Sequence, residues 1–127
     1  MKIAALISRL LLGLVFTFFG LNGFLHFLPT PPLPPTPSGR LIAAISESHY
    51  VYLVAGVQVV GGVLLLIGRY VPLALTLLGP VIVNIFVYHL LMDPKGLPLA
   101  AVVVVLWFVL FFRYRQNFSG LFVHRAA

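Results

Sequence analysis

The stretch that decides the fold is residues 79–98, GPVIVNIFVYHLLMDPKGLP. It begins with a Gly-Pro pair inside a long apolar run, and it ends in the polar turn 93–96, after which apolar residues resume. Two long apolar runs joined by so short a turn predict two antiparallel helices. Asn84 and His89 interrupt the first run. Polar side chains in such a run usually have a function, because hydrocarbon offers them no partner.

The composition predicts a membrane protein. The chain has 127 residues, the length of one domain. Hydrophobic residues make up 61% and charged residues 8%, against about 25% charged in a typical soluble domain. A soluble domain of this size leaves much of its surface exposed and could not bury so many apolar side chains. We therefore expect a single transmembrane domain over residues 1–127.

Four apolar stretches are long enough to span a bilayer, whose hydrocarbon of about 30 Å requires about 20 helical residues. Because the runs are continuous, without alternation of apolar and polar residues, helices are preferred to strands. The first run begins like a signal peptide but lacks a small-residue cleavage site, so we expect a retained helix. The prediction is an all-α bundle of four transmembrane helices, with spans at about 3–28, 50–67, 71–92 and 97–114.

The first predicted connection is rich in proline. Residues 29–37, PTPPLPPTP, cannot be helical and should form a stiff, extended strap. Ser38 is placed to cap a short helix over residues 39–48. Leu41 and Ile42 share one side of that helix, so it should lie along the outer membrane interface.

The basic residues predict the orientation. With the N-terminus inside, the outer side carries Arg40 and Lys95, together with both acids, Glu47 and Asp93. By the positive-inside rule both termini are then cytoplasmic. The cytoplasmic side carries the other six of the eight Lys and Arg residues: Lys2, Arg9, Arg69, Arg113, Arg115 and Arg125.

Several function classes are excluded or disfavoured. The net charge is +6, but there is no basic face with interleaved aromatic residues, so we expect no nucleic-acid partner. The chain has no cysteine, which removes disulfides and thiolate ligands. No nucleophile–base–acid arrangement and no phosphate loop are visible. We therefore predict no catalytic residues, and not an enzyme on its own.

Uncharged polar residues gather in the predicted outer half of the spans. Gln58, for example, falls about 12 Å below the outer end of its helix at about 1.5 Å per residue. Each of these residues has a structural explanation. Asn22, Gln58 and Asn84 can form interhelical hydrogen bonds worth about 0.6 kcal/mol each, and His26 and His89 can lie at the level of the lipid head groups. Taken together they predict a polar pocket in the outer half, lined by Asn22, His26, Glu47, His49, Gln58, Asn84 and His89.

The residue types of this predicted pocket suit a quinone head group. Histidine and carboxamide groups donate to carbonyl oxygens, and a nearby carboxylate can pass protons. A lipid head group or a small polar solute is an open alternative, as is haem between His26 and His89. The histidines with Glu47 resemble metal ligands by type, but their spacing does not, so no metal site is predicted.

Other residues predict packing and interface features. Gly13, Gly20, Gly56, Gly61 and Gly62 should be sites of close helix packing.

Pro80 should kink its helix, with the Thr76 hydroxyl compensating for the lost hydrogen bond. Arg9 has no acid nearby and should extend to inner-leaflet phosphates. Trp107 should belong to an aromatic belt at the inner boundary. The basic segment 113–125 should rest on anionic lipid.

An ordered set of motifs resembles the DoxX-like family of small integral membrane proteins, and the resemblance covers nearly the whole chain. It implies a four-helix bundle with both ends cytoplasmic, in a bacterial inner membrane. The family is named for a subunit of a thiosulfate:quinone oxidoreductase, and some relatives associate with redox enzymes. The lysine that many members carry after the glycine of the first helix is absent here. The motifs are RLLLG at 9–13, FGLNGF at 19–24, AGVQ at 55–58, RYVP at 69–72, GPVIVN at 79–84 and DPKGLP at 93–98.

The polar set and the resemblance together predict an accessory or quinone-associated component of a membrane redox assembly. Its partners would be the lipid bilayer and a membrane redox protein. Two alternatives are a lipid or small-solute binding or transport protein, and a structural interaction protein without a ligand. A homodimer is also open, because four short helices shield little of one another.

Overall fold

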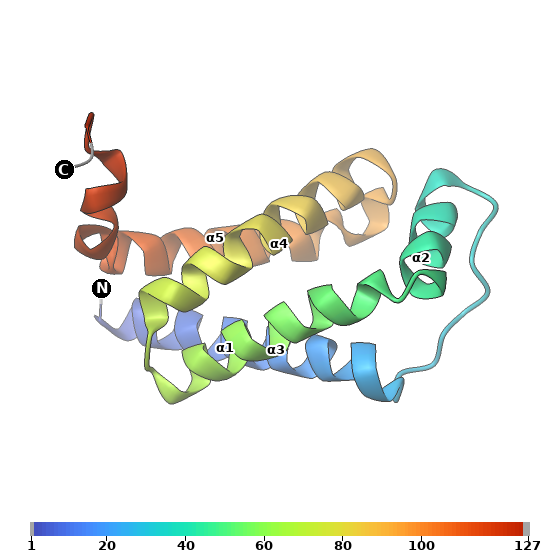
Figure 1. Ribbon diagram of the computed structural model, residues 1–127, viewed down its shortest axis with the longest axis horizontal. Helices are drawn as coiled ribbons and strands as arrows, with labels where there is room; N and C mark the ends of the chain where they lie inside the picture. The colour runs from blue at the N-terminus through green and yellow to red at the C-terminus, as the bar shows by residue number, and fades with distance from the viewer. Residues whose placement is uncertain (1, 126–127) are drawn as a thin grey trace.

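The computed structural model describes residues 2–125, and its regular elements are helices (Figure 1). Among these residues there is no strand, so the predicted all-α class is confirmed. Four helical segments are long and apolar enough to cross a membrane. The protein is therefore a multi-pass membrane protein. The elements are α1 (Lys2–Leu25), α2 (Pro37–Glu47), α3 (Tyr50–Ile67), α4 (Val71–Leu91), η1 (Pro94–Gly96), α5 (Leu97–Arg113) and η2 (Arg115–Phe122).

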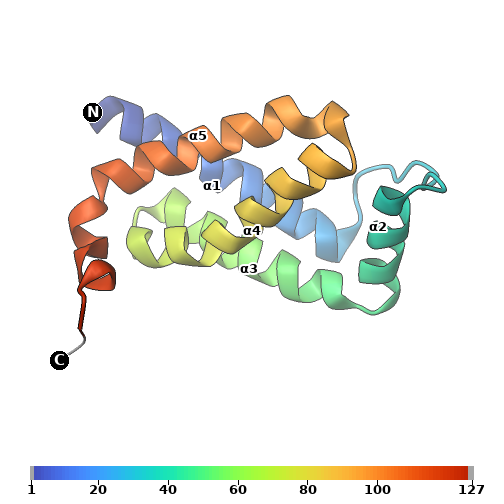
Figure 2. The same cartoon turned by 90° about the horizontal axis from the view of Figure 1, so that it is seen from above.

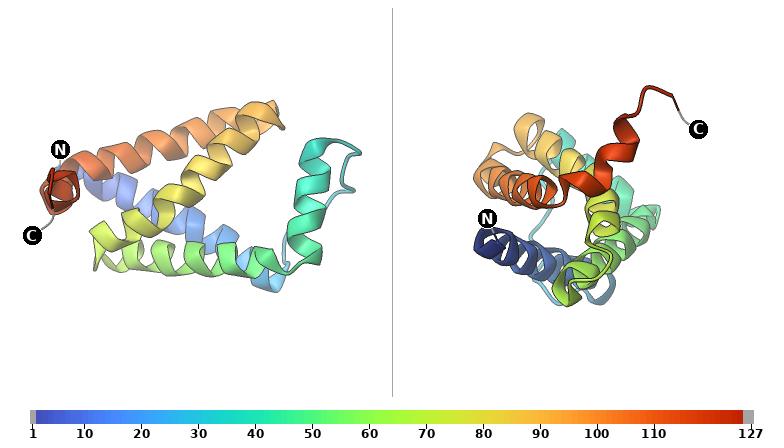
Figure 3. Two further views of the ribbon diagram at one scale, coloured as in Figure 1. Left: turned by 45° about the horizontal axis from the view of Figure 1, so that its top comes forward. Right: turned by 90° about the vertical axis from the view of Figure 1, so that its left-hand side faces the viewer.

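The four long helices form a ring in which each packs on two others. Helix α1 packs on α3, α3 on α4, α4 on α5, and α5 on α1 (Figure 3). The start of α1, the α3–α4 turn, the end of α5 and η2 lie together, and we call this the terminal end (Figure 1). The proline-rich segment, α2 and the α4–α5 turn lie at the opposite end, the loop end (Figures 1 and 2).

Glycines bring the backbones of α1 and α3 close together. A Cβ atom added at Gly62 would lie 2.6 Å from the Thr17 nitrogen and 3.0 Å from the Gly13 carbonyl oxygen. A Cβ atom at Gly20 would lie 2.9 Å from the Val59 nitrogen. These contacts confirm the predicted close packing at these positions. Gly56 differs, because its added Cβ would meet only the Phe24 ring, at 3.9 Å.

The hydrophobic core lies mainly at the terminal end. Phe16 and Ile82 are buried near the middle of the bundle, and beyond them the buried hydrophobic side chains are the smaller Ala55, Ala100 and Val103. Within the described α4 no residue after Ile82 is buried. Figures 1 and 2 show the α4–α5 turn standing away from the end of α1. The large core side chains thus lie at the terminal end, and the ends of the helices are farther apart at the loop end. The largest fully buried side chains are Leu12, Leu65, Leu75, Leu78 and Leu110, all in the terminal half.

Helix α1 ends at Leu25, three residues before the predicted limit of 28. His26 follows with a positive φ of 52°, and its N–H still donates to the Asn22 carbonyl oxygen, at 2.8 Å. The Asn22 Oδ1 accepts a hydrogen bond from the Leu28 N–H, at 2.9 Å. The Asn22 side chain therefore stabilises the turn out of the helix, which apolar periodicity does not reveal.

The predicted Ser38 cap of the short helix is wrong. Helix α2 begins earlier, at Pro37, with Thr36 at the N-cap position, and Ser38 is buried in the first turn. The Thr36 and Ser38 hydroxyl oxygens are 2.9 Å apart. The fixed φ of proline suits the first turn of a helix, which explains the earlier start.

Around Pro80, α4 is stabilised differently from the prediction. The Thr76 hydroxyl donates to the Pro72 carbonyl oxygen at 2.9 Å, not to the carbonyl that Pro80 leaves without its usual donor. The Trp107 Nε1 of α5 instead donates to the Leu75 carbonyl oxygen, at 3.0 Å. The prediction for the Thr76 hydroxyl is therefore wrong. Trp107 connects α5 to α4 through this bond.

The prediction that Arg9 extends to lipid phosphates is also wrong. Its Nη1 donates to the carbonyl oxygens of Leu65 and Leu66, at 2.7 and 3.4 Å. The side chain lies against Gly68, the C-cap of α3, whose φ of 71° ends that helix. A long cationic side chain finds acceptors at this helix end, because the last carbonyls of a helix lack partners in their own helix.

Candidate functional site

The helices deliver all seven residues of the predicted pocket to the loop half of the bundle. They come from α1 and the turn after it, from the end of α2 and the α2–α3 connection, from α3 and from α4. Within residues 2–125, no side-chain hydrogen bond joins any two of the seven. The backbone N–H of His26 donates to the Asn22 carbonyl oxygen. The structure thus gathers these residues at one end of the molecule, each with its own local contacts.

Asn22 and His26 differ in exposure. Asn22 is half-buried, and its oxygen is bonded to the Leu28 N–H while its amide nitrogen still has N–H donors. His26 is exposed on the turn after α1. Of these two residues, Asn22 is therefore the half-buried one whose N–H groups are left to donate.

Aromatic rings stack where α1 ends and α3 begins. The Tyr52 ring is 5.6 Å from the Phe24 ring, with 15° between their planes, and 5.8 Å from the His49 ring, with 10° between them. His49 precedes α3 with a φ of 63°. Sequence reasoning identified His49 but missed its neighbours. The spacing of three residues between His49 and Tyr52 is the sequence feature that indicates the contact between their rings. Glu47 is exposed at the end of α2.

Gln58 and Asn84 lie on different helices and in different surroundings. Gln58 is half-buried on α3, and its carboxamide has no hydrogen-bond partner among residues 2–125. Asn84 is exposed on α4, and its Nδ2 donates to the Pro80 carbonyl oxygen at 2.8 Å. Asn84 therefore bonds to its own helix with one N–H and keeps its Oδ1 and its other N–H.

His89 lies against the α4–α5 turn. Its Nδ1 is 3.1 Å from the Asp93 carbonyl oxygen and 3.8 Å from the Asp93 Oδ2. A Cβ atom at Gly96 would collide with the ring, so the glycine leaves space for the histidine. A neutral ring that donates from Nδ1 has an acceptor at Nε2. His89 thus joins the turn through one nitrogen and offers the other to a ligand.

The metal alternative finds no support in the geometry. Among residues 2–125, no three His, Asp or Glu side chains lie close enough to hold one ion.

An apolar groove lies between α4 and α5, beside Gly79 and with Phe122 of η2 at its edge. Its volume is about 460 Å³, within the usual range for small-molecule sites. The one polar side-chain atom of its lining, Nε1 of Trp107, is bonded to Leu75. Sequence reasoning missed this groove, although the dense aromatic residues of α5 were visible. It is lined by Gly79, Ile82, Val83, Phe86, Val87, Val104, Trp107, Phe108, Phe111 and Phe122.

Comparisons of the chain with protein-family models, with curated proteins and with solved structures find no match. The function is therefore argued from the geometry and chemistry of the loop half.

Proposed function

We propose that the chain is a DoxX-like protein of a bacterial inner membrane that serves as an accessory, quinone-associated component of a redox assembly. The observation that carries this proposal is the parting of the bundle at the loop end, where polar side chains of α1, α3 and α4 are collected. A quinone has an apolar tail and a polar ring, and such an open, mixed site in a membrane suits both parts.

The distribution of buried side chains supports a site in the loop half. The largest fully buried side chains lie in the terminal half, whereas within the described α4 no residue after Ile82 is buried. The α4–α5 turn stands away from the end of α1 in Figures 1 and 2. A flat molecule dissolved in the bilayer can reach this region from the side, without crossing the α1–α3 contact.

Donors and an acceptor for the two oxidation states of a quinone are available. The carboxamides of Asn22 and Gln58 have N–H groups that can donate to the carbonyl oxygens of an oxidised quinone. The Nε2 of His89 can accept the O–H of a reduced quinol. The stack of Phe24, Tyr52 and His49 offers an aromatic surface where α1 ends and α3 begins.

The distribution of charge supports the proposed orientation. Lys2, Arg69, Arg113 and Arg115 lie at the terminal end, and both acidic side chains lie at the loop end. By the positive-inside rule the terminal end would face the cytoplasm, and the quinone site would open toward the outer leaflet.

A lipid or apolar solute is the second candidate ligand. The groove between α4 and α5 favours it, because that groove is lined by apolar side chains and fits a segment of an acyl chain. The ligand-free alternative would be favoured by a hydrogen bond between Gln58 and Asn84. Asn84 donates to Pro80 instead.

The test is to purify the protein from quinone-containing membranes and to measure the extracted quinone per protein. The wild-type protein should retain quinone, and Gln58→Leu and His89→Ala should each lower the retained amount several-fold. Thr76→Val is the matched control, because it removes an exposed polar group of α4 that lies in the terminal half. Absence of quinone from the wild-type protein, or equal retention in all variants, would overturn the proposal. Bound phospholipid without quinone would favour the second candidate.

A further inference from the structure

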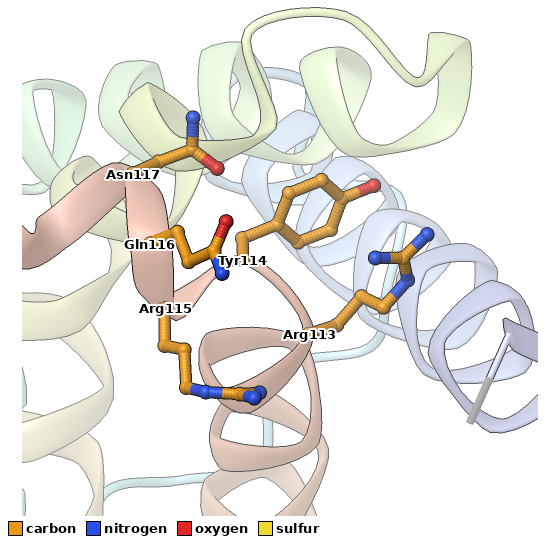
Figure 4. Close-up of a pocket in the computed structure, with 5 residues that line it drawn as sticks. All are labelled: Arg113, Tyr114, Arg115, Gln116 and Asn117. Atoms are coloured by element: carbon orange, nitrogen blue, oxygen red, sulfur yellow. The ribbon is translucent and has the colours of Figure 1, made fainter.

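We propose that the end of α5 and the start of η2 form a binding site for the phosphate head group of an anionic phospholipid. The site is a polar hollow of about 340 Å³, and it lies at the opposite end of the molecule from the proposed quinone site. The inference therefore does not depend on that proposal. Figure 4 shows the residues that line the hollow, Arg113, Tyr114, Arg115, Gln116 and Asn117.

The hollow lies at the depth of the lipid head groups. It begins where the last membrane-spanning segment, Pro94–Arg113, ends. From there η2 turns away from the axis of α5 and runs across the terminal end (Figures 1 and 3). A segment that follows a span and turns across its end lies along the membrane surface, where the phosphates are.

Helix η2 is held on the bundle. Its Phe118 is only 6% exposed, and the Phe118 ring lies 5.1 Å from the Phe111 ring of α5. The packing of Phe118 therefore holds η2, which carries three of the lining residues, against α5.

Apolar side chains at the end of η2 indicate contact with lipid. Leu121, Phe122 and Val123 are 72%, 75% and 58% exposed. Three consecutive apolar residues this exposed are unfavourable in water, whereas at an interface they can enter the acyl-chain region. This feature favours a lipid over a soluble phosphate as the source of the head group.

The hollow has the donors that a phosphate needs. Arg115 donates from Nη1 to the Phe112 carbonyl oxygen, which orients its guanidinium and leaves its other N–H groups for a ligand. The Arg113 guanidinium lies 5.8 Å from the centre of the Tyr114 ring. In Figure 4 the Arg113 guanidinium lies beside the Tyr114 ring, the Arg115 side chain extends away from that ring, and the Gln116 carboxamide lies near Tyr114. Guanidinium groups bind phosphate oxygens in pairs, and carboxamide N–H groups add neutral donors.

The surrounding charge favours an anion. Lys2 and Arg69 lie at the same end of the bundle, whereas Glu47 and Asp93 lie at the loop end. An anionic leaflet is attracted to such an end. Within this positively charged end, the donors of the hollow would bind one phosphate at a defined position.

The experiment measures lipid retained by the full-length protein. Protein taken from nanodiscs of phosphatidylcholine with phosphatidylglycerol is analysed by native mass spectrometry. We expect bound phosphatidylglycerol on the wild-type protein, and about tenfold less on the double variant Arg113→Gln/Arg115→Gln, because two charge-assisted sets of hydrogen bonds are lost. The control Arg69→Gln/Arg125→Gln removes the same charge at the same end, outside the hollow, and should retain the lipid.

Equal losses in the two double variants would overturn the proposal, because they would show diffuse attraction only. If the arginine variant does not fold, Gln116→Ala/Asn117→Ala tests the same hollow without a change in charge and should also retain less lipid. Thermal unfolding in detergent with inorganic phosphate forms the second arm. Stabilisation by inorganic phosphate equal to that by phosphatidylglycerol would assign the hollow to soluble phosphate and overturn the lipid assignment.

Discussion

The Arg9 guanidinium of α1 donates a hydrogen bond of 2.7 Å from Nη1 to the Leu65 carbonyl oxygen near the end of α3. Within its own segment this carbonyl has only the Gly68 N–H of the helix cap, at 3.3 Å, and hydrocarbon supplies no further donor. One helix of the bundle thus completes the hydrogen bonding of its neighbour. This relationship gives a membrane-embedded arginine a structural role without an acidic partner.

Replacement of Arg9 should destabilise the contact between α1 and α3. Arg9→Leu removes the charged donor of the Leu65 carbonyl and leaves only the longer bond from the Gly68 N–H, at 3.3 Å. A hydrogen bond to a charged group contributes about 1.5–3 kcal/mol. We expect a loss of this size in the free energy of unfolding, measured by circular dichroism in detergent. Arg9→Lys should recover part of it. Arg40→Leu, an exposed arginine of α2, is the control. Equal stability of Arg9→Leu and Arg40→Leu would contradict the role of this bond.

The close approach of α1 and α3 predicts a difference between two glycines of one helix. Gly62→Ala would place a Cβ 2.6 Å from the backbone nitrogen of Thr17, so the helices must separate. Overpacking of this kind typically costs about 1–3 kcal/mol. Gly56→Ala meets only a ring atom at 3.9 Å and should be tolerated. Thermal unfolding of the two variants compares them directly, and similar melting temperatures would refute the close contact.

Trp107 should stabilise α4 through its N–H group. Trp107→Phe keeps an aromatic ring in the groove but removes the donor to Leu75, and a hydrogen bond of this kind contributes about 0.5–1.5 kcal/mol. The loss should appear in unfolding monitored by circular dichroism. Phe108→Leu, at the neighbouring exposed position, should change stability by less than about 0.5 kcal/mol. A Trp107→Phe protein as stable as wild type would show that the bond is dispensable.

Gly96 should be required for the position of His89. A Cβ atom at Gly96 would collide with the imidazole, so Gly96→Ala must displace the ring or the turn. We expect a changed histidine signal in the NMR spectrum and a lower melting temperature. Gly120→Ala is the matched control, because its added Cβ meets nothing within 4 Å. An unchanged histidine signal in Gly96→Ala would contradict the packing of this turn.

Local patterns predicted much of the fold. The span limits differ from the observed helices by at most three residues, the largest difference being at the end of α1. There the Asn22 side chain and the positive φ of His26 end the helix within an apolar run. The loop-half position of the polar residues followed from the alternating direction of the helices. Their individual partners did not, since Asn84 bonds to its own helix and His89 to the following turn.

The sequence by itself determined the class of the protein, the four membrane spans and the end of the bundle that carries the positive charge. Length, hydropathy and charge order decide these, because a bilayer admits only segments that satisfy their own backbone. Only the tertiary structure decided that Arg9 bonds to Leu65, that Trp107 bonds to Leu75, and that the core closes one end and leaves the other parted. Each of these contacts joins residues far apart in the chain, so it depends on how side chains from different helices fit together.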